Sequence, residues 1–213
     1  KYIPDAVGHG AVAVLAPPGT STDDPHVPLI ADANPRRRLA LMAARFFEKQ
    51  PETMVAITGT NGKSTTTALI GHVLESSGLE IAIGGNLGPP ALSLDPLGAG
   101  GIYVLELSSY QLDLTHDARF DIAVLLNISP DHLDRHGGMD GYAAVKKSIF
   151  KRQTRPRTAV IGVDDVYCRA IYDELVAADE QVVIGVSGSD RVPGGVYAAG
   201  GVLVDDTEGT EAM

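Results

Sequence analysis

The chain has 213 residues, of which 44% are hydrophobic, and a net charge of −10. The acidic balance argues against nucleic acid as a partner, because duplex binding normally needs a basic face. No apolar run approaches the ~20 residues of a membrane span, and no basic-then-apolar leader is visible. The single cysteine, Cys168, excludes an internal disulfide framework and fits a reducing compartment. We therefore expect a cytoplasmic protein, without a membrane partner, that handles a small anion.

Residues 1–50 are interpreted as a unit of their own, and the domain boundary is placed at Gln50-Pro51-Glu52. An apolar run over 10–16 predicts a buried strand, a proline-rich loop follows, and 28–32 is a possible short strand. Asn34-Pro35 then provides an N-cap and a first-turn proline for a helix. Its apolar positions at helical spacing are Leu39, Met42, Ala43, Phe46 and Phe47. The Arg36-Arg37-Arg38 run is interpreted as a solvated first turn rather than a phosphate grip.

From Met54 onward, apolar strand patterns alternate with helical ones, which predicts an α/β domain over 51–213 with a mostly parallel sheet and crossover helices. The predicted strands are 54–58, 80–83, 102–106, 122–127, 158–161 and 182–185, and the predicted helices are 64–77, 139–150 and 164–178. Glycine-rich segments between 194 and 206 predict a small antiparallel hairpin near the C-terminus. Ligands of such sheets bind at the carboxyl ends of the strands, so the residues after each strand are the candidates for a site.

The first strand leads into Thr58-Gly59-Thr60-Asn61-Gly62-Lys63-Ser64-Thr65. This order of strand, glycine-rich turn and helix is typical of a phosphate-binding loop (P-loop) of a mononucleotide-binding fold. The glycines allow successive N–H groups to point into one concavity, and the following helix directs its positive dipole end there. Lys63 would reach the terminal phosphates, and the Ser64 hydroxyl would bind Mg²⁺. Ile57 replaces the first glycine of the longer consensus, so the match is to its shorter form.

Polar residues follow the neighbouring strands. Glu106 ends the 102–106 strand, where a carboxylate beside a phosphate loop is an expected magnesium ligand. The 122–127 strand is followed by two aspartates, two histidines and an arginine within residues 131–136. Asp131 and Asp134 also suit turn-forming roles. Zinc is an alternative metal, but oxygen-rich chemistry beside a nucleotide favours magnesium.

Two further segments carry weaker signals. Asn86 is the informative side chain of a glycine-rich turn after the 80–83 strand, where backbone can approach a ligand closely. Lys146 and Lys147 lie on a predicted helix that either faces the same cleft or presents an ordinary surface pair of lysines.

Three motifs together resemble, in order and spacing, the central ATPase domain of the Mur ligases. They are the P-loop, Glu106-Leu107-Ser108-Ser109-Tyr110-Gln111-Leu112, and residues 127–136. The resemblance covers residues 54–185, and the second motif is similar to the branch that adds D-glutamate to UDP-N-acetylmuramoyl-L-alanine in peptidoglycan precursor synthesis. Residues 1–50 look more like the end of the N-terminal domain of the branch that adds diaminopimelate or lysine. We therefore expect a hybrid, reconstructed or truncated form, without the family's C-terminal ligase domain.

The resemblance implies an ATP- and Mg²⁺-dependent, ADP-forming ligase that works through an acyl-phosphate. It implies phosphate binding by Gly59, Thr60, Asn61, Gly62, Lys63, Ser64 and Thr65. Ser64 and Glu106 would bind one Mg²⁺ and His132 a second, with Lys146 as a ligand if carbamylated. The catalytic residues would be Lys63, Glu106, His132 and Lys146. Asn86, Ser109 and Gln111 would contact the UDP-muramoyl substrate.

Alternatives remain at this point. We expect a nucleotide-binding fragment with little or no ligation by itself, and a non-catalytic P-loop binding or interaction module is the alternative of a different class. A ligase of the folylpolyglutamate synthase type shares the expected fold, but Ser64 and the Ser-Ser-Tyr-Gln run favour the Mur ligases. A P-loop kinase is disfavoured because no lid or acceptor motif is visible.

Overall fold

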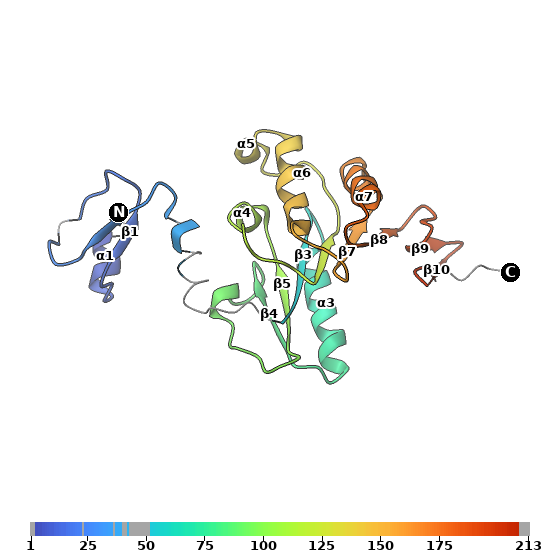
Figure 1. Cartoon of the computed structure of the whole chain (residues 1–213), viewed down its shortest axis with the longest axis horizontal. Helices are drawn as coiled ribbons and strands as arrows, with labels where there is room; N and C mark the ends of the chain where they lie inside the picture. The colour runs from blue at the N-terminus through green and yellow to red at the C-terminus, as the bar shows by residue number, and fades with distance from the viewer. Residues whose placement is uncertain (1–2, 23, 36, 40–41, 43–51, 209–213) are drawn as a thin grey trace. The chain divides into compact units, whose positions relative to one another are not determined.

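The structure is a computed structural model that describes residues 3–22, 24–35, 37–39, 42 and 52–208, and the chain divides into two compact units, 1–50 and 51–213 (Figure 1). In the first unit, helix α1 (Ile3–Gly8) precedes strands β1 (Val14–Ala16) and β2 (Leu29–Ala31), which pair in parallel. The strand predicted over 10–16 is therefore too long. Its first residues instead close the end of α1, because the Gly10 and Ala11 N–H groups donate to Val7 and Ala6 carbonyls.

The helix predicted to start at Asn34-Pro35 begins there. The Asn34 carboxamide accepts a hydrogen bond from the Arg37 N–H at 3.1 Å, which is the contact of an N-cap. Arg38 pairs with Asp32, with 2.6 Å between Nε and Oδ2. Ala43, Phe46 and Phe47, which were expected on the apolar face of this helix, lie outside the described residues.

The second unit is built on a sheet in the order β10-β9-β8-β7-β6-β3-β5-β4. The strands are β3 (Thr53–Thr58), β4 (Ile81–Gly85), β5 (Ile102–Glu106), β6 (Ile122–Leu125), β7 (Thr158–Gly162), β8 (Val182–Ser187), β9 (Val196–Ala199) and β10 (Val202–Asp205). All neighbours pair in parallel except β9 and β10, which form an antiparallel hairpin. The predicted α/β class, parallel sheet and C-terminal hairpin are confirmed.

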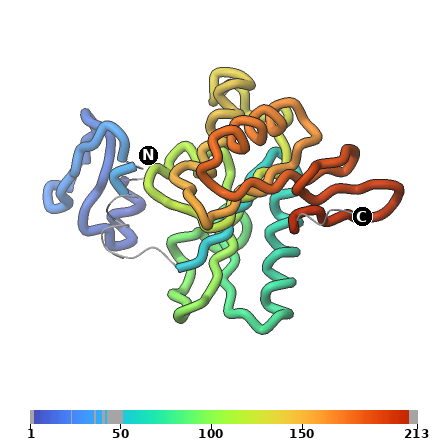
Figure 2. The backbone as a smooth tube through the Cα atoms, turned by 45° about the vertical axis from the view of Figure 1, so that its right-hand side comes forward, coloured from blue at the N-terminus to red at the C-terminus, as the bar shows by residue number. Residues whose placement is uncertain are grey.

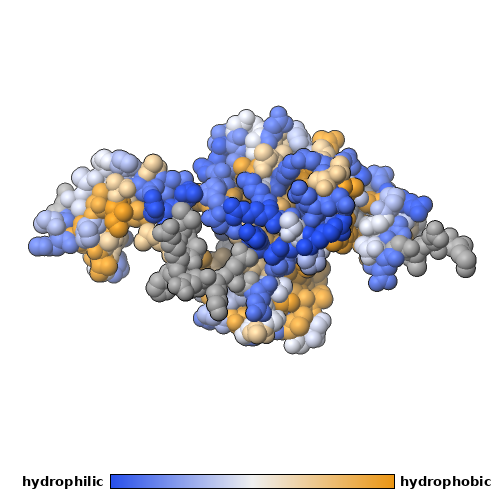
Figure 3. Space-filling model, in the orientation of Figure 1, coloured by the Kyte–Doolittle hydropathy of each residue, from blue (hydrophilic) through white to orange (hydrophobic). Residues whose placement is uncertain are grey.

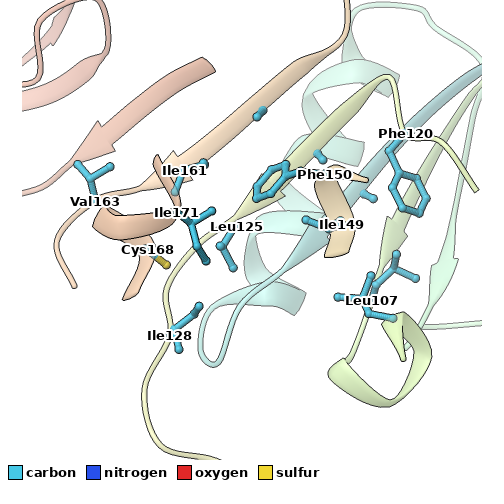
Figure 4. Close-up of a cluster of buried hydrophobic side chains, with 14 of the residues drawn as sticks. Leu107, Phe120, Leu125, Ile128, Ile149, Phe150, Ile161, Val163, Cys168 and Ile171 are labelled. Carbon is cyan, nitrogen blue, oxygen red and sulfur yellow. The ribbon is translucent and has the colours of Figure 1, made fainter. Parts of the chain in front are cut away.

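The two faces of this sheet have different covers. Met54 and Ala56 of β3 point to a core under α4 (Ser109–Leu112), α6 (Met139–Lys147) and α7 (Val166–Ala178), whereas Val55 and Ile57 point to α3 (Lys63–Ser76). Figure 2 shows α3 on the opposite side of the sheet from the segment around residues 130–180. Alternate residues of a strand face opposite sides, so these unbroken apolar runs are what a strand covered on both faces requires. Figure 4 shows the larger core, in which Leu125, Ile149, Ile161 and Cys168 converge.

Two helices begin or end at other residues than predicted. The helix predicted from 164 begins at Val166, because the Asp165 carboxylate caps it by accepting the N–H groups of Tyr167 and Cys168 at 3.0 and 2.9 Å. The helix predicted over 139–150 ends at Lys147 and continues as a 3₁₀ turn, η2 (Ser148–Phe150). In the second unit, three short helical turns were not predicted, namely η1 (Ala91–Ser93), α4 and α5 (Leu133–His136), and α1 in the first unit was not predicted either.

The α3 side of the sheet is incompletely covered. A groove of about 420 Å³ beside α3 is lined by residues that include Ile70, Leu74, Val124 and Val160. Leu69 and Val73 on α3 itself are 59% and 54% exposed, and Figure 3 shows apolar surface in the region of this helix. Within the described residues, no helix is long and apolar enough to cross a membrane.

Candidate functional site

The turn between β3 and α3 has the geometry of an anion site. Gly62, at φ 81° and ψ −3°, is the N-cap of α3 and provides no side-chain cap. In the described part of the chain, the N–H groups of residues 62–65 have no hydrogen-bond acceptor. A helix of 14 residues adds a partial positive charge at this end. This set of open donors at a helix N-terminus, which we call the cradle, suits an anion such as phosphate.

Lys63 lies at the edge of this cradle. Its Nζ donates to the Thr60 carbonyl at 3.0 Å and faces a pocket of about 350 Å³. The pocket collects residues from five segments that are distant in sequence. They are Lys63, Asn86, Ser108, Ser109, Tyr110, Asp131, His132, Tyr142 and Lys146. The sheet topology therefore brings most of the predicted catalytic and substrate residues to one cavity at the carboxyl ends of the strands.

Glu106 is the buried acid of the site, at 1% exposure. Its Oε2 accepts from the Ser64 hydroxyl at 2.8 Å, and its Oε1 accepts from the Asn86 amide at 2.8 Å. Among the described residues, no ion pair joins it to a lysine or an arginine. A buried carboxylate is costly without a countercharge, so the site favours a cation bound beside Ser64. Hard oxygen donors of this kind suit Mg²⁺.

Lys146 is the buried base, also at 1% exposure. Its Nζ donates to the Gly59 carbonyl at 2.7 Å and to the Thr58 hydroxyl at 3.4 Å, and it lies 4.8 Å from the centroid of the Tyr142 ring. Burial, and then the positive charge of Lys63, lower the pKa of Lys146 to about 8. Burial also raises the pKa of the Tyr142 hydroxyl.

The two lysines of α6 thus separate. Lys146 points into the pocket, whereas Lys147 pairs with Glu174 on the surface. The cleft interpretation fits Lys146 and the surface interpretation fits Lys147.

The segment after β6 supplies a second set of residues. His132 adopts a left-handed conformation, φ 49° and ψ 34°, which is uncommon for a residue other than glycine and often marks functional sites. Its Nε2 lies 3.5 Å from Asp131 Oδ2, and both residues line the pocket. Asp134 is exposed in the first turn of α5, as its turn-forming alternative predicted. Within the described residues, no three His, Cys, Asp or Glu side chains cluster as metal ligands, and the preference for magnesium over zinc stays a prediction.

Several polar side chains of the motif after β5 already form hydrogen bonds within the protein. Ser108 caps α4, and the Gln111 side-chain carbonyl accepts from the Ser108 N–H at 2.9 Å, which completes a capping box. The Ser109 hydroxyl contacts His136 Nε2 at 3.1 Å. Substrate contact by Ser109, Gln111 and Asn86 therefore stays a prediction, since these side chains already have protein partners. The Ser-x-x-Gln spacing was the signal that could have predicted α4.

Tyr110 is a pocket residue that sequence reasoning did not single out. It is 40% exposed, and its ring lies edge-on to His132 with 5.1 Å between centroids. The Arg135 guanidinium lies 4.8 Å from the same ring centroid. Tyr142 was also missed, although it is buried between Lys146 and His136. The sequence around Tyr110 and Tyr142 does not predict these ring contacts, because they depend on how α4, α5 and α6 pack.

Comparison with known proteins finds relatives for most of the second unit. The family described as "Mur ligase middle domain" matches residues 57–210. The UDP-N-acetylmuramoylalanine–D-glutamate ligase of Caulobacter vibrioides (strain NA1000 / CB15N) is 55% identical over 159 residues, which are 75% of this chain and 34% of that protein. The enzyme of the same name from Rhodospirillum rubrum is 56% identical over 155 residues, 73% of this chain and 32% of that protein. This chain thus spans about a third of the length of these relatives.

Solved structures share the fold. A UDP-N-acetylmuramoyl-L-alanyl-D-glutamate–2,6-diaminopimelate ligase matches with a TM-score of 0.64 at 24% identity, over 93% of this chain and 44% of that one. The MurF ligase from Thermotoga maritima in complex with ADP matches with a TM-score of 0.61 at 20% identity, over 95% and 48%. A mutant of the L. casei FPGS matches with a TM-score of 0.54 at 16% identity, over 80% and 54%. At these identities the likeness concerns the fold alone.

Proposed function

This chain belongs to the Mur ligase family, and from that premise we propose that it binds Mg·ATP at the start of α3 as the nucleotide-binding core of a D-glutamate-adding ligase. The observation that carries the proposal is the open N-terminus of α3, with N–H groups at residues 62–65 that lack acceptors in the described chain, next to the buried Ser64–Glu106 pair. Phosphate oxygens would meet the N–H groups and Lys63. This combination supplies positive charge where the transferred phosphoryl group gathers negative charge.

A magnesium ion fits the oxygen donors beside the cradle. Ser64 and Glu106 would hold one ion, and His132 with Lys146, if carbamylated, would hold a second. When bound, Mg²⁺ supplies charge neutralisation for the phosphate oxygens. The residues of this chain do the rest. The Asn86 amide fixes one oxygen of Glu106, so that the other stays directed at Ser64.

The low pKa of Lys146 matters for its predicted modification. With a pKa of about 8, a larger share of this side chain is neutral near pH 7 than for an ordinary lysine. A neutral amine attacks CO₂ and loses one proton, which leaves a carbamate with two oxygen ligands in place of a cation. Carbamylation would thus replace an unfavourable buried ammonium, close to Lys63, by a group that suits a metal site.

The proposed reaction joins a carboxylate to an amine. An oxygen of the UDP-muramoyl-type substrate's carboxylate attacks the γ-phosphorus of ATP, and the bond to the leaving ADP oxygen breaks. The amine of D-glutamate then attacks the acyl carbon, phosphate leaves, and the amine loses a proton as the amide forms. Lys63 would hold the γ-phosphate throughout, while Asn86, Ser109 and Gln111 would orient the substrate. Both substrates are cytoplasmic metabolites by this proposal.

The main alternative is a non-catalytic nucleotide-binding module. It is supported by the coverage, because this chain spans only about a third of the relatives' length. A stably folded domain that binds nucleotide without turnover would retain every feature of the cradle. Amide or inorganic phosphate formation by the purified chain, given ATP, substrate and D-glutamate, separates the two. Production of both at equal rates supports the ligase, and binding without either supports the non-catalytic module.

Calorimetric titration with Mg·ATP tests the nucleotide site itself. We expect Lys63→Ala to weaken binding at least about tenfold, or ~1.4 kcal/mol, because it removes the ammonium at the edge of the cradle. Lys147→Ala is the matched control, since this lysine lies on the surface against Glu174, and it should leave the affinity unchanged. A folded chain that does not bind Mg·ATP would overturn the proposal.

A further inference from the structure

The side chain of Asn127, just beyond the end of β6, is bonded to the backbone of the phosphate loop. Its Oδ1 accepts from the Asn61 N–H at 2.9 Å, and its Nδ2 donates to the Asn61 carbonyl at 3.1 Å. One planar carboxamide thus holds both backbone groups of a single loop residue. We propose that Asn127 is a positioning residue that sets the conformation in which the loop receives phosphate, an inference that rests on the proposed nucleotide site.

This pair of bonds belongs to a longer seam between the loop and the segment 126–129. The Leu126 N–H donates to the Thr58 carbonyl and the Thr60 N–H donates to the Asn127 carbonyl, both at 2.9 Å. The Thr60 hydroxyl accepts from the Ser129 N–H at 3.0 Å and donates to the Ser129 carbonyl at 3.2 Å. The seam is made of backbone groups and the Thr60 hydroxyl except at Asn61, where the Asn127 side chain supplies both contacts.

The seam divides the loop into two parts with different tasks. The N–H groups of Thr60 and Asn61 are occupied by the seam, whereas those of residues 62–65 are open within the described chain. The direction of the Asn61 carbonyl is also fixed, because Nδ2 of Asn127 holds it. Without that bond the peptide could rotate, and a carbonyl oxygen turned toward the cradle would repel phosphate. Asn127 therefore preorganises the second half of the loop by fixing the first.

The chemistry of the contact selects asparagine. It requires one donor and one acceptor in a fixed plane, which a carboxamide of this length provides. An aspartate has the same shape but can only accept, so it loses the bond to the Asn61 carbonyl. It also adds a negative charge next to the phosphates. Alanine loses both bonds and leaves the Asn61 N–H free to compete for other acceptors.

The test compares Asn127→Ala and Asn127→Asp with Ser129→Ala by Mg·ATP calorimetry. Ser129 is the matched control, because its seam contacts use backbone atoms and its hydroxyl has no hydrogen bond within the described residues. We expect Asn127→Ala to weaken Mg·ATP binding about tenfold, Asn127→Asp to weaken it more, and Ser129→Ala to stay within about twofold. Thermal unfolding of the nucleotide-free variants identifies any that do not fold. A merely structural role would lower the midpoint and leave affinity unchanged at a temperature where the variant is folded.

Amide hydrogen exchange without nucleotide gives a readout that is independent of ATP. The Asn61 N–H should exchange at least about tenfold faster in Asn127→Ala and at an unchanged rate in Ser129→Ala. If the unsubstituted chain binds Mg·ATP and Lys63→Ala binds it at least about tenfold more weakly, full affinity in Asn127→Ala overturns this inference and leaves the nucleotide site standing. If the unsubstituted chain does not bind, the proposed function fails. In that case only the Asn61 exchange rate tests whether Asn127 holds the loop, and an unchanged rate in Asn127→Ala overturns the inference.

Discussion

The phosphate loop adjoins a second group of side chains, Ser64, Asn86 and Glu106, which we call the Glu106 wall, and the two satisfy their polar groups in opposite ways. The loop leaves the N–H groups of residues 62–65 without acceptors in the described chain. On the Glu106 wall, by contrast, each carboxylate oxygen has a donor, Ser64 or Asn86. The loop is therefore ready for an anion as it stands. The wall carries a buried charge that is hydrogen-bonded but has no countercharge among the described residues, and it gains most from a bound cation.

Under the proposed function, this difference would let one site serve both partners of Mg·ATP. Open backbone donors are insensitive to side-chain rotamers, so they are formed as soon as β3 and α3 pack against the sheet. The carboxylate depends on side chains from three segments, at residues 64, 86 and 106. We expect substitutions on the wall to change metal dependence, and substitutions around the loop to change affinity for the phosphates.

The largest predicted effect concerns Lys146, whose ammonium is buried on the loop side against the Gly59 carbonyl. Its pKa is about 8 in the folded chain and 10.5 unfolded, so between those values the unfolded state holds more protons and stability rises with pH. The cost of burying the ammonium is complete below about pH 8 and is relieved by about pH 10.5, a change on the order of 3 kcal/mol.

Denaturant titrations of the unsubstituted chain and Lys146→Met from pH 7.5 to 10, in CO₂-free buffer, measure this effect. The extra rise in stability should disappear in Lys146→Met and persist in Lys147→Met, because Lys147 is on the surface. Equal pH slopes for all three proteins would contradict the account. Adding bicarbonate sharpens the test, since carbamylation should stabilise the unsubstituted chain and leave Lys146→Met unchanged.

The next largest effect is expected from a substitution at Gly85, whose backbone lies against that of Glu106. Gly85 has φ +105°, and a Cβ there would lie 2.3 Å from the Glu106 carbonyl oxygen. Gly85→Ala should therefore displace Glu106 and lower the free energy of unfolding by ~2 kcal/mol or more. Gly88 has φ +70° in the same turn, but its Cβ would approach nothing closer than 3.9 Å. Gly88→Ala should cost about 1 kcal/mol, from strain alone. Equal costs in urea denaturation would show that the contact with Glu106 is unimportant.

Glu106→Gln sharpens the comparison without changing the shape of the side chain. The substitution removes the charge, so Mg²⁺ should no longer improve ATP binding by more than about twofold. In the unsubstituted chain we expect an improvement of about tenfold. Calorimetry with ATP in EDTA and with Mg·ATP measures the ratio for each protein. A ratio that is unchanged in Glu106→Gln would remove Glu106 from the metal site.

The smallest predicted effect lies in α4, beside the wall. Ser108→Ala removes the cap whose side chain accepts the Gln111 N–H, which should cost about 1 kcal/mol in thermal unfolding. Mg·ATP affinity should be unchanged, because the cap does not contact the phosphate loop. A loss of affinity larger than the loss of stability would mean that α4 helps to shape the nucleotide site.

Local sequence signals predicted the loop side well. The apolar run, the glycines and Lys63-Ser64 lie next to one another in the chain, and their structure follows from the strand and helix that flank them. The position of Glu106 beside the loop was equally predictable, because this residue ends an apolar strand that pairs directly with β3.

Contacts between distant segments were beyond the sequence patterns. The hydrogen bond from the Asn86 amide to Glu106 was not predicted, whereas substrate contact by Asn86 stays a prediction. The bond forms because β4 and β5 align Gly85 with Glu106. That register depends on sheet pairing, which no local pattern specifies. The contact between Asn127 and Asn61 was missed for the same reason, since the two residues are 66 positions apart. Tyr110 and Tyr142 depend on the packing of short helices that weak local signals did not reveal.

The most direct test of the central claim is a titration of the ¹⁵N-labelled chain followed by backbone amide chemical shifts. With Mg·ATP, we predict the largest shifts at Gly62, Lys63, Ser64 and Thr65, whose N–H groups are open within the described chain. The Asn61 amide should move little, because Asn127 already holds it, and adenosine without phosphates should shift none of them. Saturable shifts elsewhere in the chain, with residues 62–65 unmoved, would show that the cradle at the start of α3 is not where this protein binds nucleotide.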